Sequence, residues 1–334
     1  MRHPAAVPAL RLALALCLLS LPTLASSSAL QRYQLPDGAI TVYLAGNTVD
    51  PYFAAKALLA ARQAGADETA ATRDFIAWLL PRQKPDGRFE RYCRQDWKFI
   101  ACASADADDA LLAVWMELLV SFAPQDGMPA AWAESLARAS QFLLTLRDRR
   151  LGVYQISRDL PVALLMDNIE VISAFRALAN WQLAQGKVKE SKAWHRRADA
   201  LAKSVRQVFQ RPDGSYRVST QSRTGNEFYP DRVAQVFPLL GDMEGAEAAA
   251  NFGRWLRANR GMWFEQAGRD YPWALVALAA YKVGDRHTVA CWRAHAAPFR
   301  HGSHWNVLEE VIFVALGALG DDAPTGACFG EDGK

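Results

Sequence analysis

The stretch LLAVWMELLVSF, residues 111–122, indicates the fold because a helix formed by it is apolar almost all round. A helix without a polar face is stable only when other protein surrounds it. Residues 164–183, 271–281 and 307–319 have the same character. The sequence therefore predicts a layer of buried helices.

A second kind of helix alternates with these segments and has a single apolar stripe. Apolar residues recur at steps of three and four along residues 194–209, and several basic residues lie between them. The stripe consists of Trp194, Ala198, Leu201, Val205 and Phe209. Residues 68–83 and 134–146 follow the same pattern, which is typical of helices in an outer layer.

The two kinds of helix are separated by a repeated turn signal. Pro-Asp-Gly occurs at residues 36–38, 85–87 and 212–214, and looser copies lie at residues 151–154, 261–264 and 301–303. An extended or aromatic piece and then a helix follow each turn. This self-similarity, at intervals of roughly fifty residues, predicts helical hairpins as the repeating unit.

We predict an all-α fold, an (α/α)6 toroid that forms one domain over residues 26–334. The sixth outer helix is expected to be vestigial, because only residues 26–35 precede the first turn. An open solenoid is the alternative, but its ends would need polar caps and the last inner helix is apolar throughout. The six inner helices are expected to start near Asp50, Asp106, Ala163, Pro230, Tyr271 and Ser303.

The first residues resemble an export signal. A basic start is followed by the short apolar run 12–21 and by small residues, which predicts a signal peptide over residues 1–25 and a periplasmic or secreted protein. Cleavage after Ala29 and an uncleaved anchor are the alternatives. No second membrane segment follows. The net charge of +3 is spread along the chain, which argues against nucleic acid as a partner.

Four cysteines follow the apolar run. In an oxidising compartment Cys93 can pair with Cys102 and Cys291 with Cys328, and free thiols are the alternative. Their spacing does not resemble a metal site, and we expect no cofactor.

Acidic residues gather at the expected starts of the inner helices. An isolated Asp at such a place is usually an N-cap. The run Asp106, Asp108 and Asp109 exceeds what capping needs, and Asp167 with Glu170 and Glu309 with Glu310 lie inside apolar helices. Because buried carboxylates are costly, this set predicts a functional site.

Two short segments resemble glycoside hydrolase family 8, within the six-hairpin glycosidases. Residues 104–108, followed by residues 111–113, resemble the Asp-x-Asp motif of that family, and residues 229–233 resemble its Tyr-Asp-x-x-Arg-Val segment. The resemblance implies that Asp106 lies in the sugar-distorting subsite and that Asp231 is the general base. The family's general acid is a Glu, and Asp50 stands at the corresponding place, so Asp50 acts as the acid, or the site is inactive or differently organised.

These features predict an inverting, endo-acting glycoside hydrolase for a bacterial exopolysaccharide. Its acid would be Asp50 or Glu310, its base Asp231, and Asp106 would hold the distorted sugar. The substrate-binding residues are expected to be Tyr52, Trp97, Asp108, Asp167, Glu170, Tyr229, Arg232, Tyr271, Trp273 and Trp305.

Two other functions remain open from the sequence. A polysaccharide lyase or epimerase on the same ring would use Tyr229, Arg232 and His304 around a uronic acid. A non-catalytic protein would bind or assemble an envelope polysaccharide, in an exopolysaccharide synthesis or export complex.

Overall fold

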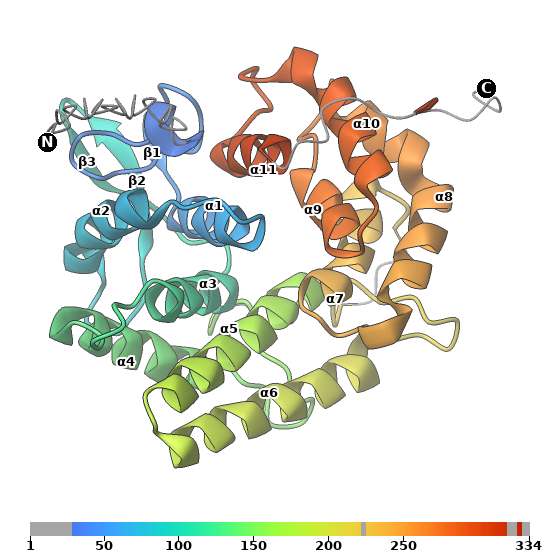
Figure 1. The fold of residues 1–334 in the computed structure, drawn as a ribbon. Helices are drawn as coiled ribbons and strands as arrows, with labels where there is room; N and C mark the ends of the chain where they lie inside the picture. The colour runs from blue at the N-terminus through green and yellow to red at the C-terminus, as the bar shows by residue number, and fades with distance from the viewer. Residues whose placement is uncertain (1–28, 222–224, 319–325, 329–334) are drawn as a thin grey trace, which may run out of the picture.

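The structure, a computed structural model, describes residues 29–221, 225–318 and 326–328, and its helices form two layers around a common axis (Figure 1). The predicted signal peptide, residues 1–25, lies outside the described residues. The inner helices are α1 (Pro51–Gln63), α3 (Asp108–Ser121), α5 (Leu165–Ala184), α7 (Phe237–Leu240), α9 (Ala274–Lys282) and α11 (Val307–Gly317). The outer helices are α2 (Thr69–Leu79), α4 (Ala130–Thr145), α6 (Val188–Phe209), α8 (Ala248–Gln266) and α10 (Arg286–Ala296).

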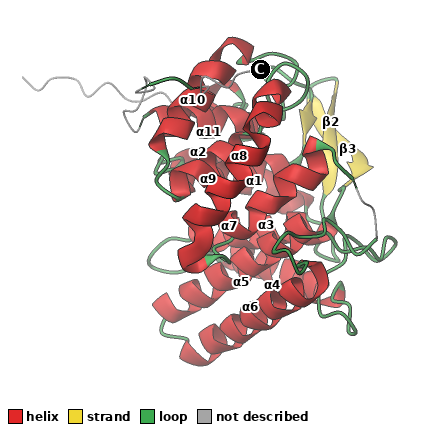
Figure 2. Ribbon diagram, turned by 90° about the vertical axis from the view of Figure 1, so that its right-hand side faces the viewer, coloured by secondary structure: helices red, strands yellow, loops and turns green. Residues whose placement is uncertain are grey.

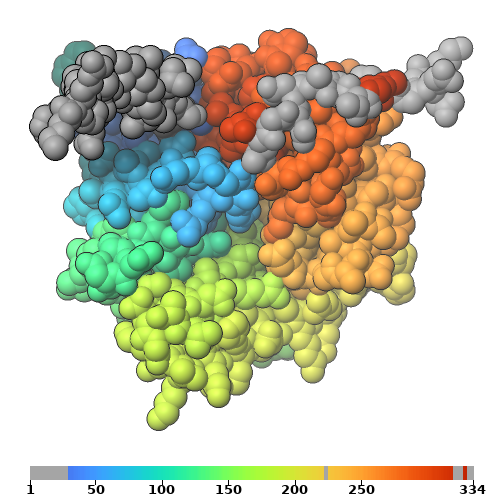
Figure 3. Space-filling view, viewed as in Figure 1, coloured from blue at the N-terminus to red at the C-terminus, as the bar shows by residue number. Residues whose placement is uncertain are grey.

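The inner helices form a closed ring. Each packs against the next along the chain, and α1 also packs against α11. The chain therefore returns to its starting point, so that its first and last described helices lie side by side (Figure 3). The fold is an all-α toroid, as predicted, and the open solenoid is wrong. A single 3-10 turn, η1 (Ala29–Arg32), packs on α11 where a sixth outer helix would lie.

Burial follows the two predicted helix types. Trp115 of α3 is fully buried, and its indole N–H donates to Ser135 Oγ of α4 at 2.9 Å, which joins an inner helix to its outer partner. In α6, by contrast, the buried residues are confined to one stripe that includes Ala198, Leu201 and Val205. Apolar burial on one face of each outer helix and all round each inner helix produces the two layers.

The three Pro-Asp-Gly turns share one local structure. In each, the Asp carboxylate accepts a hydrogen bond from the backbone N–H two residues later, at 3.1 Å for Asp37, 3.1 Å for Asp86 and 2.9 Å for Asp213. Gly87 has φ +98°, in the left-handed region that favours glycine. The repeat in the sequence is therefore a repeat in the structure.

Two details of the prediction are wrong. Residues 261–264 form part of α8 rather than a turn, because Trp263 and Phe264 are buried on the core face of that helix and no Pro or Asp redirects the backbone. The fourth inner helix is broken into a π-turn η3 (Phe228–Arg232), a 3-10 turn η4 (Val233–Val236) and the short α7. Pro230 and Pro238 interrupt helical hydrogen bonding there.

A small antiparallel sheet, not predicted from the sequence, adjoins the ring (Figure 2). It contains β1 (Thr48–Val49), β2 (Glu90–Gln95) and β3 (Lys98–Ser104), in that order. Cys93 and Cys102 form a disulfide across β2 and β3, and Cys291 and Cys328 form a second one. Within the described part of the chain, none of the helices has the length and apolar character needed to cross a membrane.

Candidate functional site

A cleft of ≈ 360 Å³ opens where the inner helices begin. The loops before α1, α3 and α9 line it together with the first turns of α5 and α11 and the π-turn η3. Its acidic and aromatic residues are Asp50, Tyr52, Phe53, Asp106, Asp167, Tyr229, Phe237, Asp270, Tyr271, Trp273 and Glu309. The acidic leading ends of the inner helices therefore face one shared space.

Two carboxyl groups at the base of the cleft form a pair. Asp109 is fully buried, Asp167 is 7% exposed, and the two side chains hydrogen-bond to each other. No amide or hydroxyl donor of a described residue reaches either Oδ2 atom. Burial raises the pKa of Asp109 to about 7 and that of Asp167 well above its usual range. Because two carboxyl groups hydrogen-bond only when one is protonated, the pair retains a proton near neutral pH.

Asp50 is the N-cap of α1 and lies on the cleft wall. Its Oδ1 accepts a hydrogen bond from the backbone N–H of Tyr52 at 3.0 Å. Burial raises the pKa of the Asp50 carboxyl, and the nearby Arg91 guanidinium opposes that rise. Asp50 thus caps α1 and also lines the cleft.

The small sheet positions Asp106 near Asp50. Strand β1 ends directly before Asp50 and β3 ends two residues before Asp106, while β2 lies between the two strands. Arg91 of β2 donates to Asp106 Oδ2 at 3.1 Å and lies 3.0 Å from Oδ1, so that it holds both carboxylate oxygens. The Asp106 side chain is 76% exposed, which places this ion pair at the rim.

Aromatic rings form the wall on the α9 side. Tyr229 stacks on Trp273 with ring centres 5.1 Å apart, and Tyr271 meets Trp273 edge-on. Trp273 has a left-handed backbone, with φ 57°, and the following Ala274 N–H donates to Glu309 Oε2 at 2.7 Å. Burial raises the pKa of Glu309 to about 8. Glu309 therefore anchors the loop that presents these rings.

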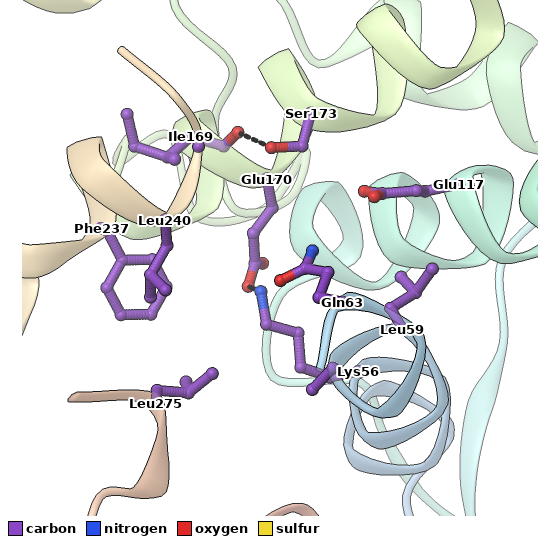
Figure 4. A pocket seen from close by; sticks show the side chains of 12 residues that line it. Lys56, Leu59, Gln63, Glu117, Ile169, Glu170, Ser173, Phe237, Leu240 and Leu275 are labelled. Carbon is purple, nitrogen blue, oxygen red and sulfur yellow. Dashed lines mark hydrogen bonds and ion pairs between the residues drawn. The ribbon is translucent and has the colours of Figure 1, made fainter. Parts of the chain in front are cut away.

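Glu170 lies below the cleft in a second, smaller cavity of ≈ 30 Å³ (Figure 4). Its Oε1 accepts hydrogen bonds from Lys56 Nζ at 2.6 Å and from the Tyr52 hydroxyl at 2.7 Å. Burial raises the pKa of Glu117, which lines the same cavity, to about 7. Glu170 is thus an ion-paired group beneath Tyr52 and does not line the cleft.

Six predicted site residues also lie away from the cleft lining. Asp231 accepts a hydrogen bond from the Glu227 N–H at 3.1 Å, inside its own loop, and Glu310 binds Arg300 and the indole N–H of Trp305. Arg232 donates to Asn226, and Asp108 faces Arg88. Trp305 is buried, whereas Trp97 is 91% exposed between β2 and β3. The catalytic roles of Asp231 and Glu310 stay predictions, and this geometry gives them no support.

Some residues of this site have no individual role predicted from the sequence. Asp109 is the buried partner of Asp167. The sequence did contain a signal for it, because Asp109 is the third carboxylate in a run at a helix start that capping does not explain. Asp270 and Glu309 line the cleft as well. Tyr43, whose hydroxyl lies 3.0 Å from that of Tyr271, had no signal, because only the folded ring brings the two together.

The comparisons with known proteins agree on the fold. A rhamnosidase from Klebsiella oxytoca with rhamnose bound superposes with a TM-score of 0.57 at 12% identity, over 80% of this chain and 58% of the rhamnosidase. A reducing end xylose-releasing exo-oligoxylanase superposes with a TM-score of 0.55 at 11% identity, over 87% of this chain and 86% of the other.

A third similar structure is a GH63 mannosylglycerate hydrolase from Thermus thermophilus in complex with glucose. Its TM-score is 0.54 at 13% identity, over 87% of this chain and 98% of that one. No protein-family model matches the sequence, and no curated protein matches it. The chain thus has the α/α toroid fold that these glycosidases share.

Proposed function

We propose that the protein is a glycoside hydrolase, with Asp167 as proton donor and Asp50 as the base. The observation that carries this proposal is the Asp109–Asp167 pair at the base of a cleft walled by stacked aromatic rings. Glycoside hydrolysis needs one protonated and one ionised carboxyl group, and rings provide apolar faces for sugars. The three similar structures, all named for enzymes that act on sugars, agree with this choice.

The proton balance of the reaction follows from these roles. Asp167 gives its proton to the glycosidic oxygen as the bond from that oxygen to the sugar carbon breaks. Asp50 accepts a proton from the water that forms the new bond to that carbon. Asp109 is a positioning residue, because its hydrogen bond keeps Asp167 protonated until the bond breaks. Asp106, fixed by Arg91 at the rim, is suited to bind a sugar hydroxyl.

The substrate expected from the sequence, a bacterial exopolysaccharide, fits an exported enzyme with a site open to solvent. Export to the periplasm or medium, and association with a synthesis or export complex, belong to the same proposal. A closer relation to glycoside hydrolase family 8 would rest on the segment around Asp106, which lines the cleft. The segment around Asp231 supports that relation less, since Asp231 does not line the cleft.

The lyase or epimerase alternative has less support. Such enzymes neutralise a uronic carboxylate with a cation. Of the described residues that line the cleft, none is Lys, Arg or His. Tyr229 lines the cleft, whereas Arg232 and His304 do not, so the three residues of that alternative do not share the cleft lining.

Substitution of the two acids tests the proposal. Reducing-end release from a panel of exopolysaccharide fragments should fall about 10²–10⁴-fold in Asp167→Asn and in Asp50→Asn. Asp126→Asn, an exposed change, is the matched control. Asp231→Asn tests the assignment made from sequence: loss of activity there with full activity in Asp167→Asn would refute our pair. Cleavage of none of the glycans, together with sugar binding, would favour the non-catalytic alternative.

A further inference from the structure

A second open groove, of ≈ 600 Å³, lies in the outer layer between the end of α4 and α6. Among the described residues, none lines both this groove and the cleft. Its basic residues are Arg147, which follows α4, and Arg196 and Arg197 of α6. The described part of its lining contains no Asp or Glu. The groove is therefore basic, in contrast to the acidic cleft.

The positive charge of the groove has no counter-ion in the part of the chain that the structure describes. None of the three guanidinium groups forms an ion pair there. Asp148, next to Arg147 in the chain, accepts hydrogen bonds from the backbone N–H groups of Arg150 and Leu151 at 2.7 and 2.9 Å instead. Like charges without a counter-ion repel one another, and a bound anion would remove that cost.

A buried hydroxyl group lies in the same groove. Tyr154 lines the groove but is only 2% exposed, and its ring packs edge-on against Phe175 with centres 5.7 Å apart. Its backbone N–H and C=O both bond to Asn168, whereas its hydroxyl has no hydrogen-bond partner among the described residues. Because a buried polar group without a partner costs free energy, this hydroxyl points to a ligand.

The hydroxyl of Tyr154 is a donor at neutral pH. Burial raises its pKa to about 12, and the guanidinium groups of Arg147 and Arg197 oppose that rise. The hydroxyl therefore keeps its proton, and it lies in the field of two cations. Arg197 is itself held by Trp194, whose ring centre lies 4.9 Å from the guanidinium carbon. The groove thus combines fixed cations with a neutral hydrogen-bond donor.

A phosphomonoester suits this set of groups. Guanidinium groups bind phosphate oxygens in pairs of parallel hydrogen bonds. Three positive charges balance a dianion better than a monoanion, and a phosphomonoester carries about −1.5 to −2 charges and three acceptor oxygens at pH 7. A carboxylate or a sulfate ester carries a single charge. The apolar part of the lining offers a surface to the group that bears the phosphate, and it consists of Leu144, Ala193, Ala200 and Leu201.

We infer that the groove between α4 and α6 binds a phosphomonoester group, with the three guanidinium groups around its oxygens and the Tyr154 hydroxyl donating to one of them. The site lies outside the cleft, so the inference does not depend on the proposed hydrolysis. A soluble sugar phosphate and the headgroup of phosphatidic acid both supply this chemistry.

Two binding measurements on the whole protein test the inference and separate these sources. Glucose 6-phosphate is titrated calorimetrically, with glucose 6-sulfate as its matched control. Vesicles of phosphatidylcholine that contain phosphatidic acid are compared by sedimentation with vesicles that contain phosphatidylglycerol at equal charge. We expect at least one phosphomonoester to bind about tenfold or more tightly than its control, with an affinity that falls as salt is raised. Failure of both to exceed their controls would overturn the inference.

Substitutions in the groove give a second readout with the probe that binds. Arg147→Gln combined with Arg197→Gln should weaken binding about tenfold or more, because charge-assisted hydrogen bonds are lost. Tyr154→Phe removes only the hydroxyl and should weaken binding about three- to tenfold. Arg149→Gln, an exposed change outside the groove lining, is the matched control and should stay within about twofold. Wild-type affinity in either groove variant, or an equal loss in Arg149→Gln, would also overturn the inference.

Discussion

At the scale of single residues, the site depends on carboxyl groups that burial keeps protonated. In water, Asp167 and Glu309 would be ionised at neutral pH. Burial inside the toroid of helices separates both carboxyl groups from water and raises the pKa of each. The two groups differ in their partners. Asp167 faces another acid, whereas Glu309 accepts a backbone N–H. This difference suits one to give up a proton and the other to hold a loop.

Glu309 also makes stability depend on pH. The pKa of about 8 in the folded protein exceeds the value of about 4.3 for an unfolded Glu. The folded state therefore holds a proton that the unfolded state lacks, and the resulting stabilisation is lost as pH rises from about 4.5 through 8. The free energy of unfolding is measured by denaturant titration from pH 5 to pH 8. Over this range its decrease should be a few kcal/mol smaller in Glu309→Gln than in the wild type. Glu265→Gln, an exposed change, should keep the wild-type slope. Parallel pH profiles for wild type and Glu309→Gln would contradict this cause.

At the scale of elements, the Pro-Asp-Gly turns differ in how they contact the outer helices. Two of them press against an outer helix: a Cβ at Gly38 would lie 2.4 Å from Asp74 O, and one at Gly87 would lie 2.5 Å from Arg138 O. Gly214 has a similar backbone, with φ +85°, but nothing lies within 4 Å of its Cβ position. The same motif therefore serves as a docking contact in two places and as a free turn in the third.

Alanine substitutions separate these two roles. Gly214→Ala should lose only the conformational cost of a left-handed residue, about 1–2 kcal/mol. Gly87→Ala should lose more stability than Gly214→Ala, because the backbone of α4 must also move to make room for the Cβ atom. Thermal unfolding of both variants measures the difference. Similar losses would show that the contact with Arg138 is unimportant.

The hairpin of β2 and β3 is a second element with a specific task, since it holds Asp106 through Arg91. Replacing Cys93 and Cys102 by Ala opens its disulfide and should cost about 2–3 kcal/mol of stability. It should also raise KM, because Arg91 and Asp106 lose their fixed register. Removal of the disulfide between Cys291 and Cys328 is the control, expected to lower the melting temperature without a change in KM. An unchanged KM in the first variant would separate the hairpin from substrate binding.

At the scale of the whole molecule, closure of the ring couples its ends. Because α1 contacts both α3 and α11, a defect in the last helix should also destabilise the first. Ile312→Ala, at a fully buried site of α11, should cost about 2–5 kcal/mol. Hydrogen exchange should then speed up in α1 and in α3, on the other side of α1. Exchange that rises only in α9 to α11 would indicate that the ring opens locally.

The two helix types, their alternation and the repeated turns could be predicted from the sequence, because these depend on the periodicity of side chains within single segments. The buried run at residues 111–122 and the stripe at residues 194–209 are local patterns of this kind. The sequence also placed acids at the inner-helix starts, where Asp50, Asp106 and Asp167 do line the cleft.

Which acids meet depends on how the helices pack in three dimensions. Asp109 and Asp167 lie 58 residues apart by number, and only the packing of α3 against α5 pairs them. Asp231 and Glu310 follow the same sequence pattern as residues of the site, yet groups nearby in the chain bind them. A helix start can be predicted from nearby residues. The direction of a side chain and its burial depend instead on segments that are distant in the sequence.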